Sequence, residues 1–371
     1  MAKISIVLHD LRGGGAEKMM VRLANQLAED GDQVEMILLT AGGVNKPFLN
    51  QSVTLVELNS TRTLSAFSPL RKHLKDSKPD GILAALTHVN VITSIVCASL
   101  GWLPRLSVSE RNTFSLDRKV NNGLVMKATY AIAPFIYRLL PNPVIAVSKG
   151  VADDLVACSV VRQQDVSTAS NPVITTQTLN AAKQDAKHPW LTNKEHKTIV
   201  AVGRLSDQKG FDMLIDAFSM VSKQFKARLV IFGEGELRAP LQSQIDRLKL
   251  TEYVDLAGYT ENPIAEIKQA DLFVLSSRFE GSPNVLVEAM SVGCKVIAFD
   301  CPSGPMETLQ GGDVAPLVEC KNVTVLAQTM VTELATDNSQ QNRNRIIQAV
   351  ERFSAQNSAK EYRHLILHTV K

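Results

Sequence analysis

The chain has 371 residues, of which 45% are hydrophobic and 21% charged, and its 40 basic and 37 acidic side chains give a net charge of +3. The length corresponds to about two domains, and the composition excludes a disordered tail, a collagen-like chain and a small disulfide scaffold. Because the charges nearly balance, a protein whose main role is to coat nucleic acid is excluded as well.

The first forty residues predict a βαβ unit. An apolar run at Lys3–Leu8 suits a strand buried on both faces, apolar residues recur at helical spacing over Ala16–Glu29, and Val34–Thr40 forms the next strand. A glycine-rich turn separates the first strand from the helix. Further short apolar runs continue the alternation at Val53–Leu58, Gly81–Leu86, Leu106–Ser109 and Val144–Val147. This pattern indicates a parallel sheet with crossover helices.

A second alternation follows residues 173–196, whose Thr, Gln and His-Pro clusters are typical of a linker. Its expected strands are Thr198–Val202, Ala227–Phe232, Val254–Ala257, Leu272–Leu275 and Lys295–Ala298, and its expected helices are Asp212–Phe225, Ala239–Leu248, Ile264–Gln269 and Asn284–Val292. The doubled pattern predicts an α/β protein of two Rossmann-like domains, residues 1–172 and 197–353, that face each other across a cleft. Since ligands of such sheets bind at the carboxyl ends of the strands, the loops there are the expected sites.

The cysteines and the apolar stretches indicate a cytoplasmic protein. Five cysteines, an odd number without a CxxC pair, predict buried free thiols rather than disulfides or a zinc site. The first apolar run is too short for a secretory signal. The uncharged stretch Gly81–Pro104 is interrupted at His88-Val89-Asn90, so we expect a buried strand and then a helix over Val91–Leu100 rather than a membrane span.

Two basic residues follow the strand Thr198–Val202. Arg204 and Lys209 stand at its carboxyl end, where a guanidinium and an ammonium can hold a diphosphate, the arginine as a fork and the lysine as a point charge. Taken alone, two such residues also fit a solvated loop.

A second anion-binding element follows the strand Leu272–Leu275. The segment from Glu280 to Glu288 opens a helix whose first turn, Asn284 to Leu286, offers N–H groups to an anion. The two carboxylates bracket this turn and can accept hydrogen bonds from sugar hydroxyls. The alternatives are a helix cap for Glu280 and a surface position for Glu288, although apolar neighbours disfavour the latter.

In combination, these elements resemble the family 4 retaining glycosyltransferases of the GT-B fold. The matching motifs are Gly13-Gly14-Gly15-Ala16-Glu17, Ala146-Val147-Ser148-Lys149, Ser170-Asn171-Pro172, Gly203-Arg204-Leu205, Lys209-Gly210, Gly233-Glu234-Gly235, Glu280-x7-Glu288 followed by Ala289-Met290, and Cys301-Pro302-Ser303-Gly304-Pro305. Their order and spacing agree over nearly the whole chain. No single motif is specific for this family, but the combination of the paired glutamates with the arginine and the lysine is specific for it.

The resemblance implies a role for each residue of the expected donor site. Arg204 and Lys209 neutralise the leaving diphosphate of a nucleotide sugar, Glu280 contacts the transferred sugar and stabilises its oxocarbenium-like transition state, and Glu288 holds the ribose hydroxyls. The other donor-binding residues implied are Gly14, Gly15, Gly203, Gly233, Tyr259, Gly281, Pro283, Asn284, Val285 and Leu286. A final helix within residues 354–371 is expected to return to the first domain.

The acceptor side is expected in the first domain, with Glu17, His88, Glu110 and Arg111 as candidates. Many relatives carry a histidine in a first-domain loop, and Arg111 stands where some show it, so His88 is considered as its substitute. A plain core histidine is the alternative for His88, and a structural ion pair with each other is the alternative for Glu110 and Arg111.

Three rival functions are considered. A dinucleotide dehydrogenase fails because the glycine loop lacks the third glycine of G-x-G-x-x-G. A metal-dependent transferase would need Asp-x-Asp at a strand end, whereas Asp30-Gly31-Asp32 falls in a turn before a strand, so neither a metal nor another cofactor is expected. A non-catalytic nucleotide-sugar-binding subunit remains the alternative, disfavoured by the intact set of basic and acidic residues.

The stretch Leu124–Leu140 is apolar and is flanked by basic residues, so it predicts either a core helix with a solvated basic face or a helix that docks on anionic lipid. We therefore expect a retaining, metal-independent glycosyltransferase acting on a glycan or lipid-linked acceptor in bacterial surface polysaccharide synthesis, with no nucleic acid partner. A UDP-hexose or UDP-N-acetylhexosamine is the expected donor, and GDP-mannose the alternative. Peripheral association with the inner membrane through the basic N-terminal domain is part of this expectation.

Overall fold

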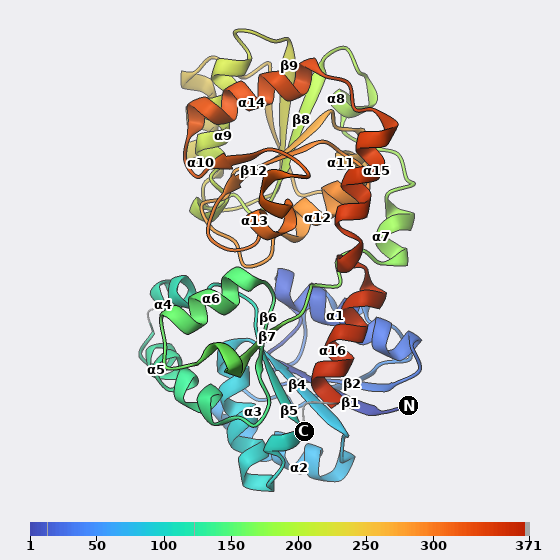
Figure 1. Ribbon diagram of the computed structural model, residues 1–371, viewed down its shortest axis with the longest axis vertical. Helices are drawn as coiled ribbons and strands as arrows, with labels where there is room; N and C mark the ends of the chain where they lie inside the picture. Colours follow the sequence, from blue (N-terminus) through green and yellow to red (C-terminus); the bar gives the residue numbers. More distant parts are fainter. Residues whose placement is uncertain (13, 122, 368–371) are drawn as a thin grey trace. The chain divides into compact units, whose positions relative to one another are not determined.

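The structure, a computed structural model, describes residues 1–12, 14–121 and 123–367. It divides into two compact units, one of residues 1–173 together with 353–371 and the other of residues 174–352. Each unit contains a fully parallel sheet with helices on both faces, as Figure 1 shows. The α/β prediction of two Rossmann-like domains is therefore confirmed.

The first unit holds a seven-stranded sheet in the order β3-β2-β1-β4-β5-β6-β7. Its strands are β1 (Lys3–Leu8), β2 (Gln33–Leu38), β3 (Thr54–Glu57), β4 (Gly81–Ala85), β5 (Leu106–Glu110), β6 (Val144–Ala146) and β7 (Val166–Thr168). Its helices are α1 (Gly15–Glu29), α2 (Phe67–Ser77), α3 (Thr87–Leu100), α4 (Phe114–Val120), α5 (Leu124–Leu139), α6 (Lys149–Ala157) and α16 (Ala355–Leu367). The strands β1 to β3 follow one another toward one edge of the sheet, and β4 then pairs with the other side of β1. The loops that follow β1 and β4 therefore lie side by side.

The second unit holds a six-stranded sheet in the order β10-β9-β8-β11-β12-β13. Its strands are β8 (Lys197–Val202), β9 (Ala227–Phe232), β10 (Val254–Gly258), β11 (Leu272–Leu275), β12 (Val296–Asp300) and β13 (Leu317–Glu319). Its helices are α7 (Thr176–Ala181), α8 (Pro189–Thr192), α9 (Phe211–Val221), α10 (Arg238–Arg247), α11 (Pro263–Gln269), α12 (Asn284–Ser291), α13 (Pro305–Thr308), α14 (Val323–Ala335) and α15 (Gln340–Ala349). The strand β8 pairs with β11, which brings the loops after these two strands together.

The last helix packs on the first unit, where α16 lies beside α1 (Figure 1). Tyr362 and Ile366 are buried in the core of this unit, and the Arg363 guanidinium donates to both carboxylate oxygens of Asp32 at 2.6 and 3.1 Å. Asp32 also accepts the Ala2 amide, so the Asp30-Gly31-Asp32 turn anchors the end of the chain. Residues 368–371, included in the expected helix, lie outside the described residues, as does Gly13 of the glycine loop.

The segment 173–196 has more structure than its linker composition indicates. It contains α7 and α8, and from Ile174 onward it belongs to the second unit. Glu266 of α11 accepts the Lys187 amide at 3.0 Å, and Asn262 donates to the Ala181 carbonyl at 2.9 Å. Side chains at the neighbouring helix α11 thus form hydrogen bonds with backbone groups of this segment.

The break expected at His88-Val89-Asn90 is absent, because α3 begins at Thr87 and runs without interruption to Leu100. The polar side chains that suggested a break have buried partners: Thr87 and Asn90 both donate to Glu110, at 3.0 and 3.3 Å. The turn before the helix is made instead by Leu86, with a φ of 82°. Among the described residues, no helix is long and apolar enough to cross a membrane.

All five cysteines, which lie within the described residues, are free thiols, as expected. Cys97, Cys294 and Cys301 are buried, and Cys158 and Cys320 are half-buried.

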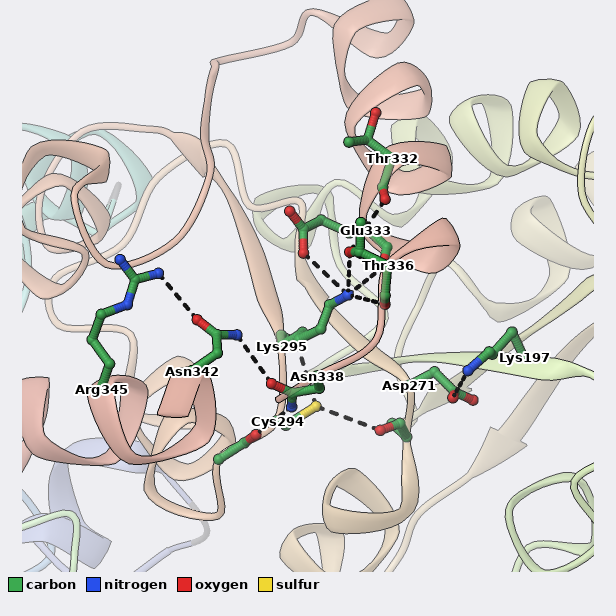
Figure 2. Close-up of polar contacts among 12 residues, drawn as sticks. Lys197, Asp271, Cys294, Lys295, Thr332, Glu333, Thr336, Asn338, Asn342 and Arg345 are labelled. Atoms are coloured by element: carbon green, nitrogen blue, oxygen red, sulfur yellow. Dashed lines mark hydrogen bonds and ion pairs between the residues drawn. The ribbon is translucent and has the colours of Figure 1, made fainter. Parts of the chain in front are cut away.

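A buried lysine caps the end of α14 (Figure 2). The Lys295 ammonium donates to the carbonyl oxygens of Glu333 and Thr336 and to the Thr336 hydroxyl, the last two at 2.6 and 2.8 Å. The Glu333 carboxylate lies 3.4 Å away. Because the last carbonyls of a helix have no intrahelical partner, this cation satisfies them.

Lys295→Met is expected to lower the free energy of unfolding by about 3 kcal/mol, because it leaves these buried acceptors without a donor. Lys226→Met, at an exposed position of the same unit, should change it by less than about 0.5 kcal/mol. Urea unfolding followed by circular dichroism measures both. Equal stability of the two variants would show that water replaces the ammonium.

Candidate functional site

The glycines after β8 and β9 allow two loops of the expected donor site to approach each other closely. The Gly203 amide donates to the Phe232 carbonyl at 3.0 Å, which extends the sheet by one bond. Gly233 has a φ of 143°, and a Cβ there would lie 1.9 Å from the Gly203 carbonyl oxygen. Only glycine fits this approach of the two loops.

Lys209 and Glu280 meet at the carboxyl ends of β8 and β11. The Lys209 Nζ lies 2.6 Å from Glu280 Oε1, and the Ser277 hydroxyl donates to the same oxygen at 2.6 Å. Both charged side chains are largely buried, Glu280 more than Lys209. The stem of Lys209 lies over Gly203, where an added Cβ would be 3.1 Å from it. The structure therefore brings three of the predicted site residues together.

The segment after β11 fixes the turn that carries Lys209. The Arg278 guanidinium binds the Asp212 carboxylate with two bonds of 2.9 and 2.6 Å and the Asp207 carbonyl at 2.7 Å. The Ser276 hydroxyl donates to the Lys209 carbonyl at 2.9 Å. Arg278 was not among the predicted site residues, although its position after a strand was a signal for it. Its role is to position the lysine.

Arg204 is exposed, and its guanidinium makes no hydrogen bond or ion pair within residues 1–12, 14–121 and 123–367. An unpaired guanidinium next to Gly203 is available to an anionic ligand. Tyr259, which follows β10, is 79% exposed.

The start of α12 differs from the expectation of three free N–H groups. The Asn284 amide donates to the Ser282 carbonyl at 2.9 Å and the Leu286 amide to the Pro283 carbonyl at 3.0 Å. These two N–H groups are therefore already used in hydrogen bonds within the turn that begins the helix. In the described part of the chain, the Val285 amide makes no backbone hydrogen bond. Glu288 is buried one turn further along, as its apolar neighbours indicated, and Gly281 and Pro283 are buried as well.

In the first unit, the glycine loop leads into α1. Gly14 is the residue before the helix and Gly15 its first residue. A Cβ on Gly14 would lie 2.0 Å from a carboxylate oxygen of Glu17. Burial raises the pKa of Glu17 above its usual value.

A pocket of about 420 Å³ lies at the carboxyl ends of β1, β4 and β5 in the first unit. Its lining includes His9, which follows β1, His88 in the first turn of α3, and Glu110 and Arg111 at the end of β5. The two histidine rings meet edge to face with centroids 5.0 Å apart. Burial lowers the pKa of both, that of His88 to about 4, so both rings are neutral at pH 7.

His9 was not among the predicted site residues, although it follows a strand just as His88 does. Its Nδ1 atom is buried without a hydrogen-bond partner in the described structure. The available signal was a polar side chain directly after the strand Lys3–Leu8.

Glu110 and Arg111 do not pair with each other, so the ion-pair alternative is wrong. Glu110 accepts hydrogen bonds from Thr87, Asn90 and the Tyr137 hydroxyl. The Arg111 guanidinium instead donates to Tyr362 at 2.6 Å and to Asn171 at 2.5 Å. Glu110 is the last residue of β5 and Arg111 the first residue after it, and successive side chains of an extended backbone point in opposite directions.

Burial raises the pKa of Glu110 to about 7 from a usual value of 4.5. Between these two pH values the folded protein keeps a proton that the unfolded chain has released, so stability falls as the pH rises through this window and levels off above it. Glu110→Gln lacks this dependence. We expect the difference in unfolding free energy between wild type and variant to change by on the order of 3 kcal/mol from pH 4.5 to 7.5.

Urea unfolding at both pH values measures this change, with the exposed Glu252→Gln as the matched control. Parallel pH profiles of wild type and Glu110→Gln would mean that folding does not raise the pKa of this carboxyl.

The chain matches two family models. One, described as glycosyl transferases group 1, matches residues 182–353, and the other, described as glycosyltransferase family 4, matches residues 13–177. The chain is a glycosyltransferase, and its N-terminal part matches family 4. The resemblance drawn from the motifs is therefore confirmed, as is its expectation of an enzyme.

Two curated relatives show how far the similarity of this glycosyltransferase extends. An N-acetylgalactosamine-N,N'-diacetylbacillosaminyl-diphospho-undecaprenol 4-alpha-N-acetylgalactosaminyltransferase of Campylobacter jejuni is 28% identical over 349 residues, 91% of each protein. An uncharacterized glycosyltransferase of Methanocaldococcus jannaschii is 41% identical, but over 117 residues, which are 31% of this chain and 29% of that relative.

Among solved structures, Anabaena HepE in complex with UDP and glucose has a TM-score of 0.78 and 20% identity, over 98% of this chain and 99% of that one. This likeness confirms the GT-B fold class of the glycosyltransferase. In the described residues, no cluster of three or more His, Cys, Asp or Glu side chains is arranged to hold a metal ion.

Proposed function

We propose that this glycosyltransferase moves a hexose or N-acetylhexosamine from a UDP donor to a glycan or lipid-linked acceptor in bacterial surface polysaccharide synthesis, with retention of configuration and without a metal. The observation that carries the proposal is the buried ion pair of Lys209 and Glu280 at two adjacent strand ends. The Campylobacter relative, named for transfer to a diphospho-undecaprenol glycan, and the UDP complex of HepE support the acceptor class and the nucleotide.

The leaving diphosphate binds to cations and to backbone amides in this proposal. Lys209 and the unpaired Arg204 supply two positive charges, and the Val285 amide supplies a donor at the start of α12. Such preorganised groups stabilise the negative charge that develops as the sugar–phosphate bond breaks. No further cation is needed, so the reaction is metal-independent.

Glu280 and Glu288 bind the sugars of the donor. Glu280, held by Lys209 and Ser277, accepts hydrogen bonds from the transferred sugar and stabilises its developing positive charge. Glu288 accepts from the ribose hydroxyls. The C1–O bond to the diphosphate breaks, the acceptor oxygen bonds to C1 on the same face, and the acceptor proton passes to the departing phosphate oxygen.

The acceptor binds in the pocket of the first unit. The neutral rings of His9 and His88 can accept from sugar hydroxyls, and the unpartnered Nδ1 of His9 is one such acceptor atom. A lipid-linked acceptor brings the enzyme to the cytoplasmic face of a membrane.

A thermal-shift panel of UDP, GDP, ADP, TDP, NAD and UDP-sugars, with and without EDTA, tests the donor class. Stabilisation by UDP and one UDP-sugar that EDTA leaves unchanged supports the proposal, whereas a response to GDP alone moves the donor to GDP-mannose. A shift that EDTA removes contradicts metal independence.

Turnover then separates an enzyme from a binding subunit, the alternative function. The purified single chain is incubated with the stabilising UDP-sugar, and the product is analysed for its anomeric configuration. An inverted product contradicts retention, and binding without any turnover on glycan or lipid-linked acceptors favours the non-catalytic subunit.

A further inference from the structure

The outer face of α5 in the first unit is apolar along its whole length. Its large exposed side chains are Leu124, Val125, Ile132, Phe135 and Leu139, each more than half exposed, and together they are called the α5 face here. At about 100° per residue they fall on one side of the helix, with the exposed Ala128 and Ala131 between them. An apolar surface of this extent marks an interaction site.

The opposite side of α5 forms the core of the unit. Tyr130, Ala133, Pro134 and Tyr137 are buried, and the helix packs against α3. Packing in the core therefore explains only the apolar residues on one side of Leu124–Leu139 and not those on its exposed side. The buried side agrees with the sequence alternative of a core helix, and the exposed side is the surface that the docking alternative requires.

Basic side chains border the α5 face. Lys127 and Arg138 lie along one edge of it, and Arg118 and Lys119 stand exposed at the end of α4, which leads into α5. The Arg138 guanidinium lies 3.5 Å from the Asp165 carboxylate, so the charge of Lys127, Arg118 and Lys119 carries most of this border. The only acidic side chain in residues 114–140, Asp117, binds the Tyr130 hydroxyl at 2.5 Å.

We infer that the α5 face docks on an anionic lipid bilayer, with α5 lying in the plane of the interface. Charge complementarity selects this occupant, because a second copy of the chain would bring two basic borders together, whereas anionic headgroups neutralise them. Apolar side chains on a helix of this kind enter the boundary between headgroups and acyl chains. The inference rests on the surface of the first unit and not on the proposed transfer reaction.

The test is cosedimentation of the full chain with vesicles of phosphatidylglycerol and phosphatidylcholine at low salt, and with vesicles of phosphatidylcholine alone. Wild type is expected to bind the anionic vesicles and to be released by high salt. Phe135→Ser/Leu139→Ser should bind at least about tenfold more weakly, since two apolar side chains leave the interface.

Lys119→Gln/Lys127→Gln should also bind about 25-fold more weakly, since each basic residue contributes roughly fivefold. The matched control is Val44→Ser/Leu64→Ser, which removes two equally exposed apolar side chains of the same unit outside α5. It should bind as wild type does. All variants should keep the wild-type melting temperature and its shift by nucleotide.

Three results would overturn the inference: no binding of wild type to anionic vesicles, equal binding by the α5 variants and wild type, or self-association without lipid that Phe135→Ser/Leu139→Ser abolishes. The last would identify a second copy as the occupant. Because nucleotide binding is read separately, failure of lipid binding leaves the proposed function standing, and the reverse also holds.

Discussion

Lys209→Ala is expected to lower the transfer rate by about a thousandfold while the protein stays folded. The reason is the place of the ammonium, buried against Glu280 at 2.6 Å at the end of β8, where the diphosphate of the donor would lie in the proposed reaction. Removing it takes away a positive charge in a site shielded from water and leaves the carboxylate of Glu280 without its ion-pair partner. Both effects disfavour the leaving group.

The measurement is the initial rate of sugar transfer, together with the melting temperature with and without UDP. Lys223→Ala, an exposed lysine of the same unit, is the control and should transfer at the wild-type rate. Wild-type activity of Lys209→Ala would refute the assignment of the donor site.

A carboxylate change should have the second largest effect. Glu288→Gln is expected to lower kcat/KM by roughly 10- to 100-fold and to remove most of the thermal shift by UDP, because hydrogen bonds to a charged group contribute about 1.5–3 kcal/mol. Glu288→Ala, which also removes the packing of the buried side chain, should lower kcat/KM further. The glutamine variant keeps the size of the buried side chain, so it separates loss of the ribose contact from loss of packing.

Glu252→Gln, which makes the same chemical change at an exposed position, should leave both kcat/KM and the UDP shift unchanged. If Glu288→Gln bound UDP as tightly as wild type, Glu288 would have a structural role in α12, and the ribose site would have to be sought elsewhere.

The sequence predicted which side chains stand at strand ends better than it predicted which of them contact one another. Lys209 and Glu280 are 71 residues apart, and both were predicted at carboxyl ends of strands. Their ion pair depends on β8 and β11 being neighbours in the sheet, which no local pattern specifies. Likewise, the acceptor-side candidate Glu110 lines the pocket of the first unit, but Tyr137, one of its hydrogen-bond partners, comes from the distant helix α5.

Local geometry produced the other differences. The interruption expected near His88 rested on polar residues, and burial beside Glu110 makes them compatible with a continuous helix. The N–H groups of Asn284 and Leu286 are occupied because the turn at Pro283 is tighter than a simple helix start. Both depend on backbone torsions and partners that the residue types alone do not define.

The sequence by itself determined the elements and the chemical types at their ends. Short runs that are apolar at every position, without alternation, predicted the parallel strands, because helices cover both faces of such a sheet. The run Lys3–Leu8 forms β1 with the predicted bounds. Tertiary structure decided which of these ends meet and which side of α5 remains exposed. The physical reason is that strand order and helix packing are set by long-range burial, whereas the pattern along the chain reports only the local period.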